Sequence, residues 1–291
     1  MTLSNNLHSQ LSKAGSTAEF ANAHIGIIGT GAIAAMLVHC LARAFPDTRL
    51  LVAGRNASAL SQLVAGASSA STANYELVAT KADYIFLAVP PEAYSALLSQ
   101  MRTHLRPETV IITLTNSISL TTLGNFVDNP IVKVIPTIAH RVGRGSTIVV
   151  SGPRANSAVV GKIVSLLSHF STPVVIDDGD SRIASNLAGS ALALFSEFAR
   201  LLISAHEGRE GSLSQGTLNQ MTAETMGAIG DLVRDGYDFQ GIINATAAPG
   251  GMTEAAVRIL RSSCEAPVKA TIEETFRRQK TAQNELDQSE G

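Results

Sequence analysis

A short apolar run near the amino terminus breaks abruptly into a glycine-rich turn, and this transition limits the folds open to the chain. Residues 24–28 read His-Ile-Gly-Ile-Ile, which has the length and branching of a buried strand, and Gly29-Thr30-Gly31 follow directly. Gly29 permits a tight turn, Gly31 lets a pyrophosphate approach the backbone, and Ala34 lets the next helix pack closely on the strand. The helix is expected to begin near Ala32, with its free N–H groups facing the phosphates. The cofactor contacts predicted in this turn are Gly29, Thr30, Gly31, Ala32, Ile33 and Ala34.

The turn after the second predicted strand, residues 49–53, bears on the choice of cofactor. Enzymes that prefer NAD usually place an acid here to hold the ribose 2′-hydroxyl, whereas this chain has Gly54-Arg55-Asn56. A guanidinium can bind a 2′-phosphate through two hydrogen bonds. Alternatively, Arg55 is an ordinary surface residue of a loop. We predict that NADP (as NADPH) is preferred over NAD, with Arg55 and Asn56 at the cofactor.

The same alternation of strands and helices continues to about residue 176. Parallel strands of an open α/β sheet bind ligands at their carboxyl ends. The loops after two of the strands therefore supply further cofactor contacts, which we predict to be Ala88, Val89, Pro90, Thr115 and Asn116. The remaining strands are predicted near 75–78 and at 83–89, 110–115, 132–135, 147–151 and 174–176, with helices at 57–67, 91–105 and 155–169.

Beyond the turn Asp177-Asp178-Gly179-Asp180 the pattern becomes helical throughout. The predicted fold class is α/β: a Rossmann-like doubly wound sheet followed by an all-α dimerisation domain. The predicted domains are a polar arm at 1–22, a nucleotide-binding domain at 23–178 and a helical domain at 179–291. Within the helical domain we predict a helix at 184–203 that is buried on most sides, a helix at 211–235 interrupted near Gly216, a loop at 238–251, a helix at 252–263, and a last helix that opens at Pro267 and fades after Lys280.

Composition excludes several classes of protein. The chain has 291 residues, 16% of them charged, and a net charge of −2, which provides no basic surface for nucleic acid. No apolar stretch is expected to reach the roughly 18 residues that span a membrane, so a cytoplasmic location is predicted. The seven histidines are scattered without ligand spacing, so no metal is expected. Cys40 and Cys264 are read as reduced core or interface residues.

A second motif, Ala248-Pro249-Gly250-Gly251-Met252-Thr253, lies in the helical region directly before a predicted helix. The two glycines can present successive N–H groups to a carboxylate. Thr253, in the first helical turn, can direct its hydroxyl at an atom beside that carboxylate. The alternative is a plain Pro-Gly-Gly loop before a helix. The predicted substrate-binding residues are Pro249, Gly250, Gly251 and Thr253, with Thr253 also the predicted catalytic residue.

Together the two motifs resemble the pyrroline-5-carboxylate reductase family, over residues 24 to about 280. The resemblance includes Ala88-Val89-Pro90-Pro91 at a strand end and the segment from Lys133 to Gly145. It implies reduction of a cyclic imine carboxylate to proline by NAD(P)H, with the Pro-Gly-Gly loop holding the carboxylate and Thr253 facing the imine nitrogen. It also implies a homodimer or higher homo-oligomer, in which the helical domain of the partner subunit completes the cleft.

The chain departs from the family pattern at three places. Thr137 stands where the family has an asparagine near the nicotinamide, and Ala248 stands where it has a serine beside the carboxylate. The family's Ser-Gly-Pro segment appears only as Gly189-Ser190-Ala191. Losing one hydrogen bond to a group that stays buried costs about 1 to 3 kcal/mol. These departures concern the substrate and leave the cofactor prediction intact.

The predicted function is NADPH-dependent reduction of a C=N bond in a small carboxylate-bearing substrate, pyrroline-5-carboxylate or a close analogue, in proline biosynthesis. A protonated imine loses its positive charge as hydride arrives, so no strong general acid is required, and His140 is read mainly as a packing or surface residue. Two alternatives stay open. One is reduction of a different imine or a keto acid, and the other is a non-catalytic NADP-binding protein on the same fold.

Overall fold

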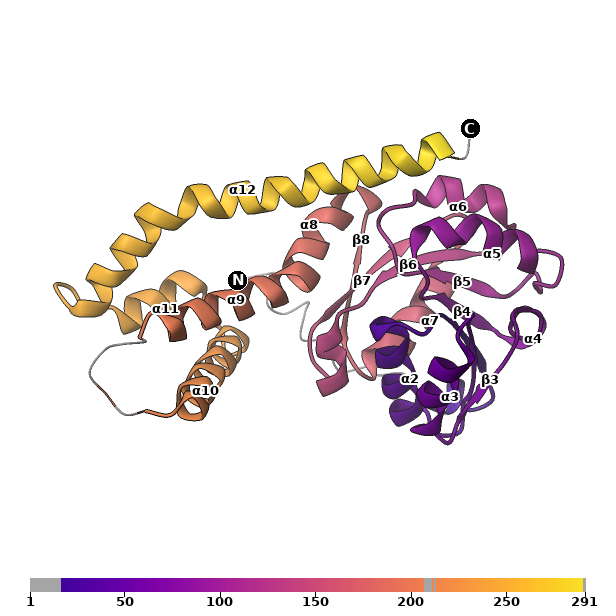
Figure 1. Cartoon of the computed structure of the whole chain (residues 1–291), viewed down its shortest axis with the longest axis horizontal. Helices are drawn as coiled ribbons and strands as arrows, with labels where there is room; N and C mark the ends of the chain where they lie inside the picture. The colour runs from indigo at the N-terminus through magenta and orange to yellow at the C-terminus, as the bar shows by residue number, and fades with distance from the viewer. Residues whose placement is uncertain (1–16, 207–210, 212, 290–291) are drawn as a thin grey trace. The chain divides into compact units, whose positions relative to one another are not determined.

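The computed structural model describes residues 17–206, 211 and 213–289 (Figure 1). The chain forms two compact units. One runs to Gly189 and also takes in the chain from Arg278 onward, and the other is Ser190–Arg277. Residues 1–16 of the predicted arm lie outside the described residues. The arm's end packs into the core, because the Phe20 ring is fully buried with its centroid 5.2 Å from that of Phe45.

The first unit is built on an eight-stranded sheet with the order β3-β2-β1-β4-β5-β6-β7-β8. The chain begins in β1, builds β2 and β3 on one side, and then crosses over to place β4 on the other side of β1. Strands β1 to β6 are parallel, β7 runs antiparallel to β6, and β8 is parallel to β7. The strands are β1 (His24–Ile28), β2 (Arg49–Ala53), β3 (Ala70–Thr72), β4 (Tyr84–Leu87), β5 (Val110–Thr113), β6 (Ile131–Ile135), β7 (Ser146–Ser151) and β8 (Thr172–Ile176).

Helices cover both faces of this sheet and bury two apolar clusters. The central strands are apolar on both sides, as strands covered on two faces must be. One face packs against α2, α3 and α7, and the other against α4, α5 and α6. The helices are α2 (Ala32–Ala44), α3 (Ala57–Ala65), α4 (Tyr75–Lys81), α5 (Tyr94–Met101), α6 (Leu120–Phe126) and α7 (Ser157–Ser168), with short 3₁₀ turns η1 (Thr17–Glu19), η2 (Pro91–Ala93), η3 (Ile138–Val142) and η4 (Asp178–Asp180).

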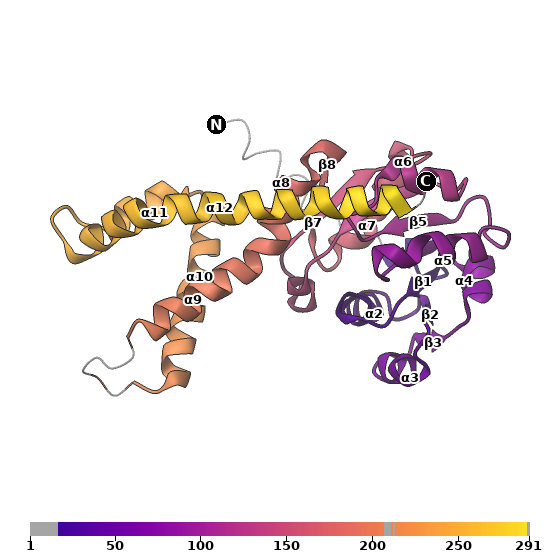
Figure 2. The same ribbon diagram turned by 45° about the horizontal axis from the view of Figure 1, so that its top comes forward.

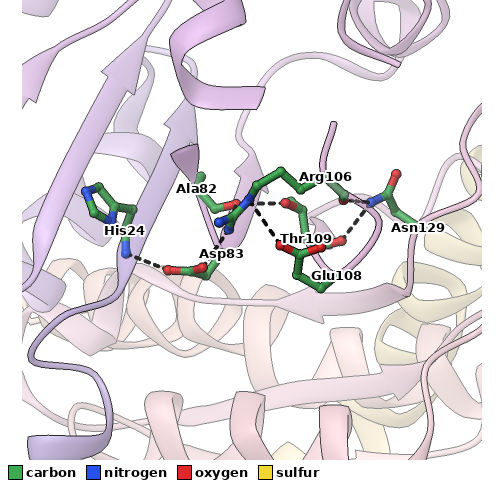
Figure 3. Close-up of polar contacts among 7 residues, drawn as sticks. All are labelled: His24, Ala82, Asp83, Arg106, Glu108, Thr109 and Asn129. Carbon is green, nitrogen blue, oxygen red and sulfur yellow. Dashed lines mark hydrogen bonds and ion pairs between the residues drawn. The ribbon is translucent and has the colours of Figure 1, made fainter. Parts of the chain in front are cut away.

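A polar network ties the amino ends of the central strands together (Figure 3). The Arg106 guanidinium donates to Asp83 Oδ1 at 2.6 Å and to the Ala82 carbonyl oxygen at 3.0 Å. The other Asp83 oxygen accepts the His24 N–H at 2.8 Å, and Asn129 Nδ2 donates to the Arg106 carbonyl oxygen at 2.7 Å. This network fixes the amino ends of the strands. Ligands of such sheets bind at the opposite edge, where the strands have their carboxyl ends.

The regular secondary structure in the described residues of the second unit is all helical (Figure 2). Among these residues only Ala191 is buried. Large apolar side chains are exposed instead, including Phe195, Phe239 and Met252. A unit of this length needs buried apolar surface to be stable, so its core must come from further contacts. The helical elements from Ser181 onward are α8 (Ser181–Ser185), a π-helical turn η5 (Asn186–Ser190), α9 (Ala191–Ser204), α10 (Gln215–Arg234), α11 (Phe239–Thr246) and α12 (Met252–Ser289).

Several local predictions were wrong. The segment predicted as a strand near 75–78 belongs to α4, and the strand of that region is β3. The predicted loop 238–251 contains α11, since Asp238 Oδ1 accepts the Gly241 N–H at 2.6 Å and caps a helix. The helix α6 was not predicted. Gly216 lies in the first turn of an unbroken α10, and α12 continues through Pro267 to Ser289.

The expectation about membrane-length segments was also wrong. The helical run Asp178–Ser204 has 27 residues and a mean hydropathy of 1.4 in its most apolar window, which is enough to cross a membrane by length and composition. The helix predicted at 184–203 lies within this run and is not buried on most sides within one chain, because only 6% of the most apolar window of the run is buried.

Candidate functional site

The predicted cofactor residues of the first unit line up along the carboxyl edge of the sheet. The Gly29 N–H donates to the Ala53 carbonyl oxygen at 2.8 Å, and the Ala88 N–H donates to the Ile28 carbonyl oxygen at 2.8 Å. The ends of β2, β1 and β4 are therefore adjacent, followed by β5 and β6. The crossover between β1 and β4 is the switch point at which open α/β sheets bind ligands.

The geometry at the first turn explains each of its small residues. Gly29 has φ +132°, and a Cβ there would lie 2.0 Å from the Ala88 carbonyl oxygen. A Cβ on Gly31 would meet nothing within 4 Å, and Gly31 caps α2 without a side-chain bond. Ala34 is fully buried. Gly29 is thus required by the fold, whereas open space at Gly31 and free first-turn N–H groups of α2 suit a pyrophosphate.

The second turn offers a cavity of about 290 Å³ beside Gly54, lined also by Asn74 and Glu76. Arg55 is exposed, and Asn56 uses its side-chain oxygen to accept the Ala59 N–H at 3.0 Å and so caps α3. The guanidinium of Arg55 is therefore available for a phosphate. Glu76, which was not predicted here, lines this cavity, whereas Arg55 is not among its lining residues.

The predicted residues after β5 have structural partners. Thr115 Oγ1 accepts the Ser117 N–H at 3.0 Å, and Asn116 Nδ2 donates to Ser185 Oγ of α8 at 2.6 Å. A neighbouring ion pair, in which Lys133 Nζ lies 2.6 Å from Asp178 Oδ1, was not predicted from the sequence. A lysine inside the apolar strand Ile131–Ile135 was the signal that could have revealed it.

The His140 ring holds the loop after β6, which carries Thr137. The His140 side chain is buried; its Nε2 accepts the Thr137 N–H at 3.1 Å, and its Nδ1 faces the Arg144 carbonyl oxygen at 3.0 Å. Because a carbonyl oxygen only accepts, Nδ1 carries the proton. Burial lowers the pKa of His140, although its bond to Arg144 acts in the opposite direction. The ring is therefore neutral and structural, in line with the packing role preferred from the sequence.

In the second unit, the N–H groups of both motif glycines are already used. The Gly250 N–H donates to Glu254 Oε2 at 2.8 Å, and the Gly251 N–H donates to the Ala248 carbonyl oxygen at 2.9 Å. Glu254 lies in the first turn of α12, where a carboxylate is favourable. An acid three residues into a helix is a capping signal, and it could have identified this contact.

A cavity of about 500 Å³ adjoins this loop between α11 and α12. Gly250, Gly251, Glu254 and Arg258 line it. Pro249 and Thr253 are exposed and are not among its lining residues. The N–H groups of the first turn of α12, those of Met252 to Glu254, have no partner inside the helix and face the same end of α12 as the glycines. The motif thus retains donors for an anion, although they are not the two predicted from the glycines.

Two family models match the chain. "NADP oxidoreductase coenzyme F420-dependent" matches residues 24–117, and "Pyrroline-5-carboxylate reductase dimerisation" matches residues 179–282. The first segment holds the glycine turn and the second holds the Pro-Gly-Gly motif. Both motifs that suggested the resemblance are therefore matched independently.

Curated relatives are similar over most of the chain. ComE operon protein 4 of Bacillus subtilis (strain 168) is 24% identical over 83% of this chain and 89% of its own length. A pyrroline-5-carboxylate reductase of Pseudomonas aeruginosa is 24% identical over 82% of this chain and 89% of its own length. The relatives therefore share both halves of the chain.

Solved structures share the fold. Pyrroline-5-carboxylate reductases from Streptococcus pyogenes and from Plasmodium falciparum, the latter with NADP bound, each superpose with a TM-score of 0.78 at 22% identity, over 91% of this chain and 99% of theirs. These superpositions show the fold. The dimerisation model shows that residues 179–282 belong to the pyrroline-5-carboxylate reductase dimerisation family, and the curated relatives extend the similarity to pyrroline-5-carboxylate reductases over both halves of the chain.

Proposed function

We propose that this protein uses NADPH to reduce the C=N bond of a small carboxylate-bearing imine, pyrroline-5-carboxylate or a close analogue. The observation that carries the proposal is the pairing of a nucleotide turn at the β1–β4 switch point with a helical unit that matches the reductase dimerisation model. The departures at Thr137 and Ala248 leave a different imine or a keto acid as the second candidate substrate.

The roles of the chain's own residues follow from their positions. The Gly29–Ala34 turn and the first N–H groups of α2 bind the pyrophosphate. When bound, the cofactor supplies a hydride. The first turn of α12 binds the substrate carboxylate, and the Thr253 hydroxyl hydrogen-bonds the imine nitrogen. The protein therefore accelerates the reaction mainly by positioning the cofactor and the substrate. A buried, neutral His140 agrees with this mechanism, because the mechanism requires no strong general acid.

The experiment that tests this proposal is NADPH oxidation by the purified protein against a panel of cyclic imine acids and keto acids. We expect turnover with an imine acid. Turnover with keto acids alone would identify the second candidate. Tight NADPH binding without oxidation by any member would replace the proposal with a non-catalytic nucleotide-binding protein.

Replacing Thr253 with valine should lower kcat about tenfold or more, because a hydrogen bond to the reacting nitrogen is lost while the side-chain volume is kept. Thr253→Ser retains the hydroxyl and is the matched control. Steady-state kinetics with the best imine substrate measure both variants. An unchanged kcat in the valine variant would remove Thr253 from the mechanism.

Replacing Arg55 with glutamine should raise the Kd for NADPH about tenfold, because a guanidinium bonded to a phosphate contributes more than a neutral group. The Kd for NADH should stay unchanged. Glu76→Gln is the opposing control and should tighten NADPH binding, since it removes a carboxylate from the cavity beside Gly54, the residue that precedes Arg55. Fluorescence titration with each nucleotide measures the effect, and equal losses for NADPH and NADH would contradict the preference for NADP.

The exposed helical unit supports a homo-oligomer as part of the proposal. Apolar side chains are exposed on all four of its helices, which a single membrane-crossing segment would not explain. The run Asp178–Ser204 also contains the ion pair of Glu197 with Arg200, and charged side chains are costly inside a bilayer. We therefore propose that a second copy of the chain covers this surface, in the cytoplasm.

A further inference from the structure

A small basic cavity of about 170 Å³ lies in the first unit, away from the predicted cofactor turn. Its walls come from the second half of α2, from η3 and from the turn between α7 and β8. Arg43 of α2 and Arg141 of η3 line it, together with His39 and His169. We call this site the basic cavity.

The floor of the basic cavity is held in place by buried groups. Cys40 Sγ donates to the His140 carbonyl oxygen at 3.3 Å, which joins α2 to η3. The His169 ring packs edge-on against Phe45, with centroids 4.7 Å apart. His169 Nε2 is buried and has no hydrogen-bond partner within the described part of the chain. The cavity is thus formed by fixed elements and retains a polar atom without a protein partner.

The charge of the basic cavity is of one sign. Burial raises the pKa of the Cys40 thiol to about 11, and the charges of Arg141 and Arg43 act against that rise. Both guanidinium groups therefore approach the same buried thiol. Cys40 stays neutral at physiological pH, and no carboxylate lines the cavity among the residues that the structure describes. Arg43 and Arg141 are both exposed, and among the described residues neither forms an ion pair with a carboxylate, so both guanidinium groups can meet an anion from solvent.

We propose that the basic cavity binds a small tetrahedral oxyanion of the phosphate class. Two guanidinium groups offer planar donor pairs, which match the oxygens of such an anion, and the volume suits an ion and not a nucleotide. The site is separate from the 2′-phosphate contact proposed for Arg55. Arg141 lies on the same loop as Thr137, and the His140 ring is hydrogen-bonded to both ends of that loop. An anion bound by Arg141 would therefore also stabilise this loop at the carboxyl edge of the sheet.

Titration of the full-length protein with inorganic phosphate, followed by ³¹P NMR line broadening or calorimetry, tests the proposal. We expect saturable binding by the wild type, and a loss of about tenfold or more in affinity in the double variant Arg43→Gln/Arg141→Gln. Arg144→Gln, an exposed arginine of the same loop that does not line the cavity, is the matched control and should bind like the wild type.

Three results would overturn the proposal. The first is a wild type that does not bind phosphate, and the second is a double variant that binds it as before while its circular dichroism and melting temperature stay normal. The third is loss of binding in Arg55→Gln, which would assign the phosphate to the nucleotide turn. A double variant that melts early is replaced by the two single variants, each of which should weaken binding.

Discussion

Replacing Gly29 with alanine should destabilise the protein by about 3 kcal/mol or more, because two costs add. The backbone at Gly29 has φ +132°, which side chains rarely tolerate, and the new Cβ would lie 2.0 Å from the Ala88 carbonyl oxygen. That carbonyl cannot easily withdraw, since the Ala88 N–H is bonded to Ile28 in the adjoining strand. Urea denaturation of the variant measures the loss.

Gly31→Ala is the matched control and separates the effect on stability from the effect on cofactor binding. Its Cβ would enter open space, so stability should change by no more than about 1 kcal/mol for a less favourable helix cap. The affinity for NADPH should nevertheless fall at least about tenfold, because the methyl group occupies the place proposed for the pyrophosphate. Normal NADPH binding by Gly31→Ala would contradict the assignment of this turn.

The second large effect is expected at the ion pair of Lys133 with Asp178. Lys133 is 3% exposed, whereas Asp178 is 46% exposed. Asp178→Asn leaves a buried ammonium without its counter-charge, which should cost about 1 to 3 kcal/mol after allowance for the solvent that reaches Asp178. Lys133→Met removes the buried charge itself and should change stability by less than about 1 kcal/mol in either direction.

The double variant Lys133→Met/Asp178→Asn completes the comparison. It should recover most of the stability lost in Asp178→Asn, because no unpaired charge remains in the sheet. Thermal or urea unfolding of the three variants and the wild type gives the coupling free energy. Equal losses of stability in Asp178→Asn and Lys133→Met would contradict this expectation. They would show that the two charges simply attract each other and that the burial of the Lys133 ammonium does not determine the loss.

The sheet of the first unit was largely predictable, because its buried strands are branched and apolar on both faces. The segment after β3 was mispredicted for a local reason. Residues 75–78 are of strand-forming type, but Asn74 precedes them, and its side-chain oxygen accepts the Leu77 N–H at 2.7 Å. A helix cap therefore outweighs the intrinsic preference of the residues that follow it.

The helical unit was less predictable, because its apolar side chains are largely exposed in the single chain. The apolar pattern of α9 indicates a buried helix, yet Phe195 is 62% exposed in the single chain. Pro267 was read as a helix start, but α12 passes through it. The carbonyl group that Pro267 leaves unbonded belongs to Ser263, four residues earlier, and Ser263 is exposed, so water can satisfy it.

The predicted site residues stay a prediction, but their local geometry can be compared with what the motifs require. The small residues of Gly29–Ala34 have the geometry that the motif requires. The hydrogen bond from the Gly250 N–H to the Glu254 carboxylate could not be predicted in this way, because it depends on how the Glu254 side chain folds back over four residues. The sequence pattern indicates which N–H donors exist, and only the folded structure shows which of them are already hydrogen-bonded.

The last strand of the sheet shows how a nucleotide-binding fold avoids polymerising through its own edge. The Thr172 N–H donates to the Gly145 carbonyl oxygen, toward β7. The next residue, Pro173, therefore directs its backbone nitrogen away from the sheet, and a proline nitrogen carries no hydrogen to donate. Val174 and Val175 are exposed on this outermost strand, which would otherwise invite a foreign strand to pair. Pro173 interrupts such pairing along this edge of the sheet.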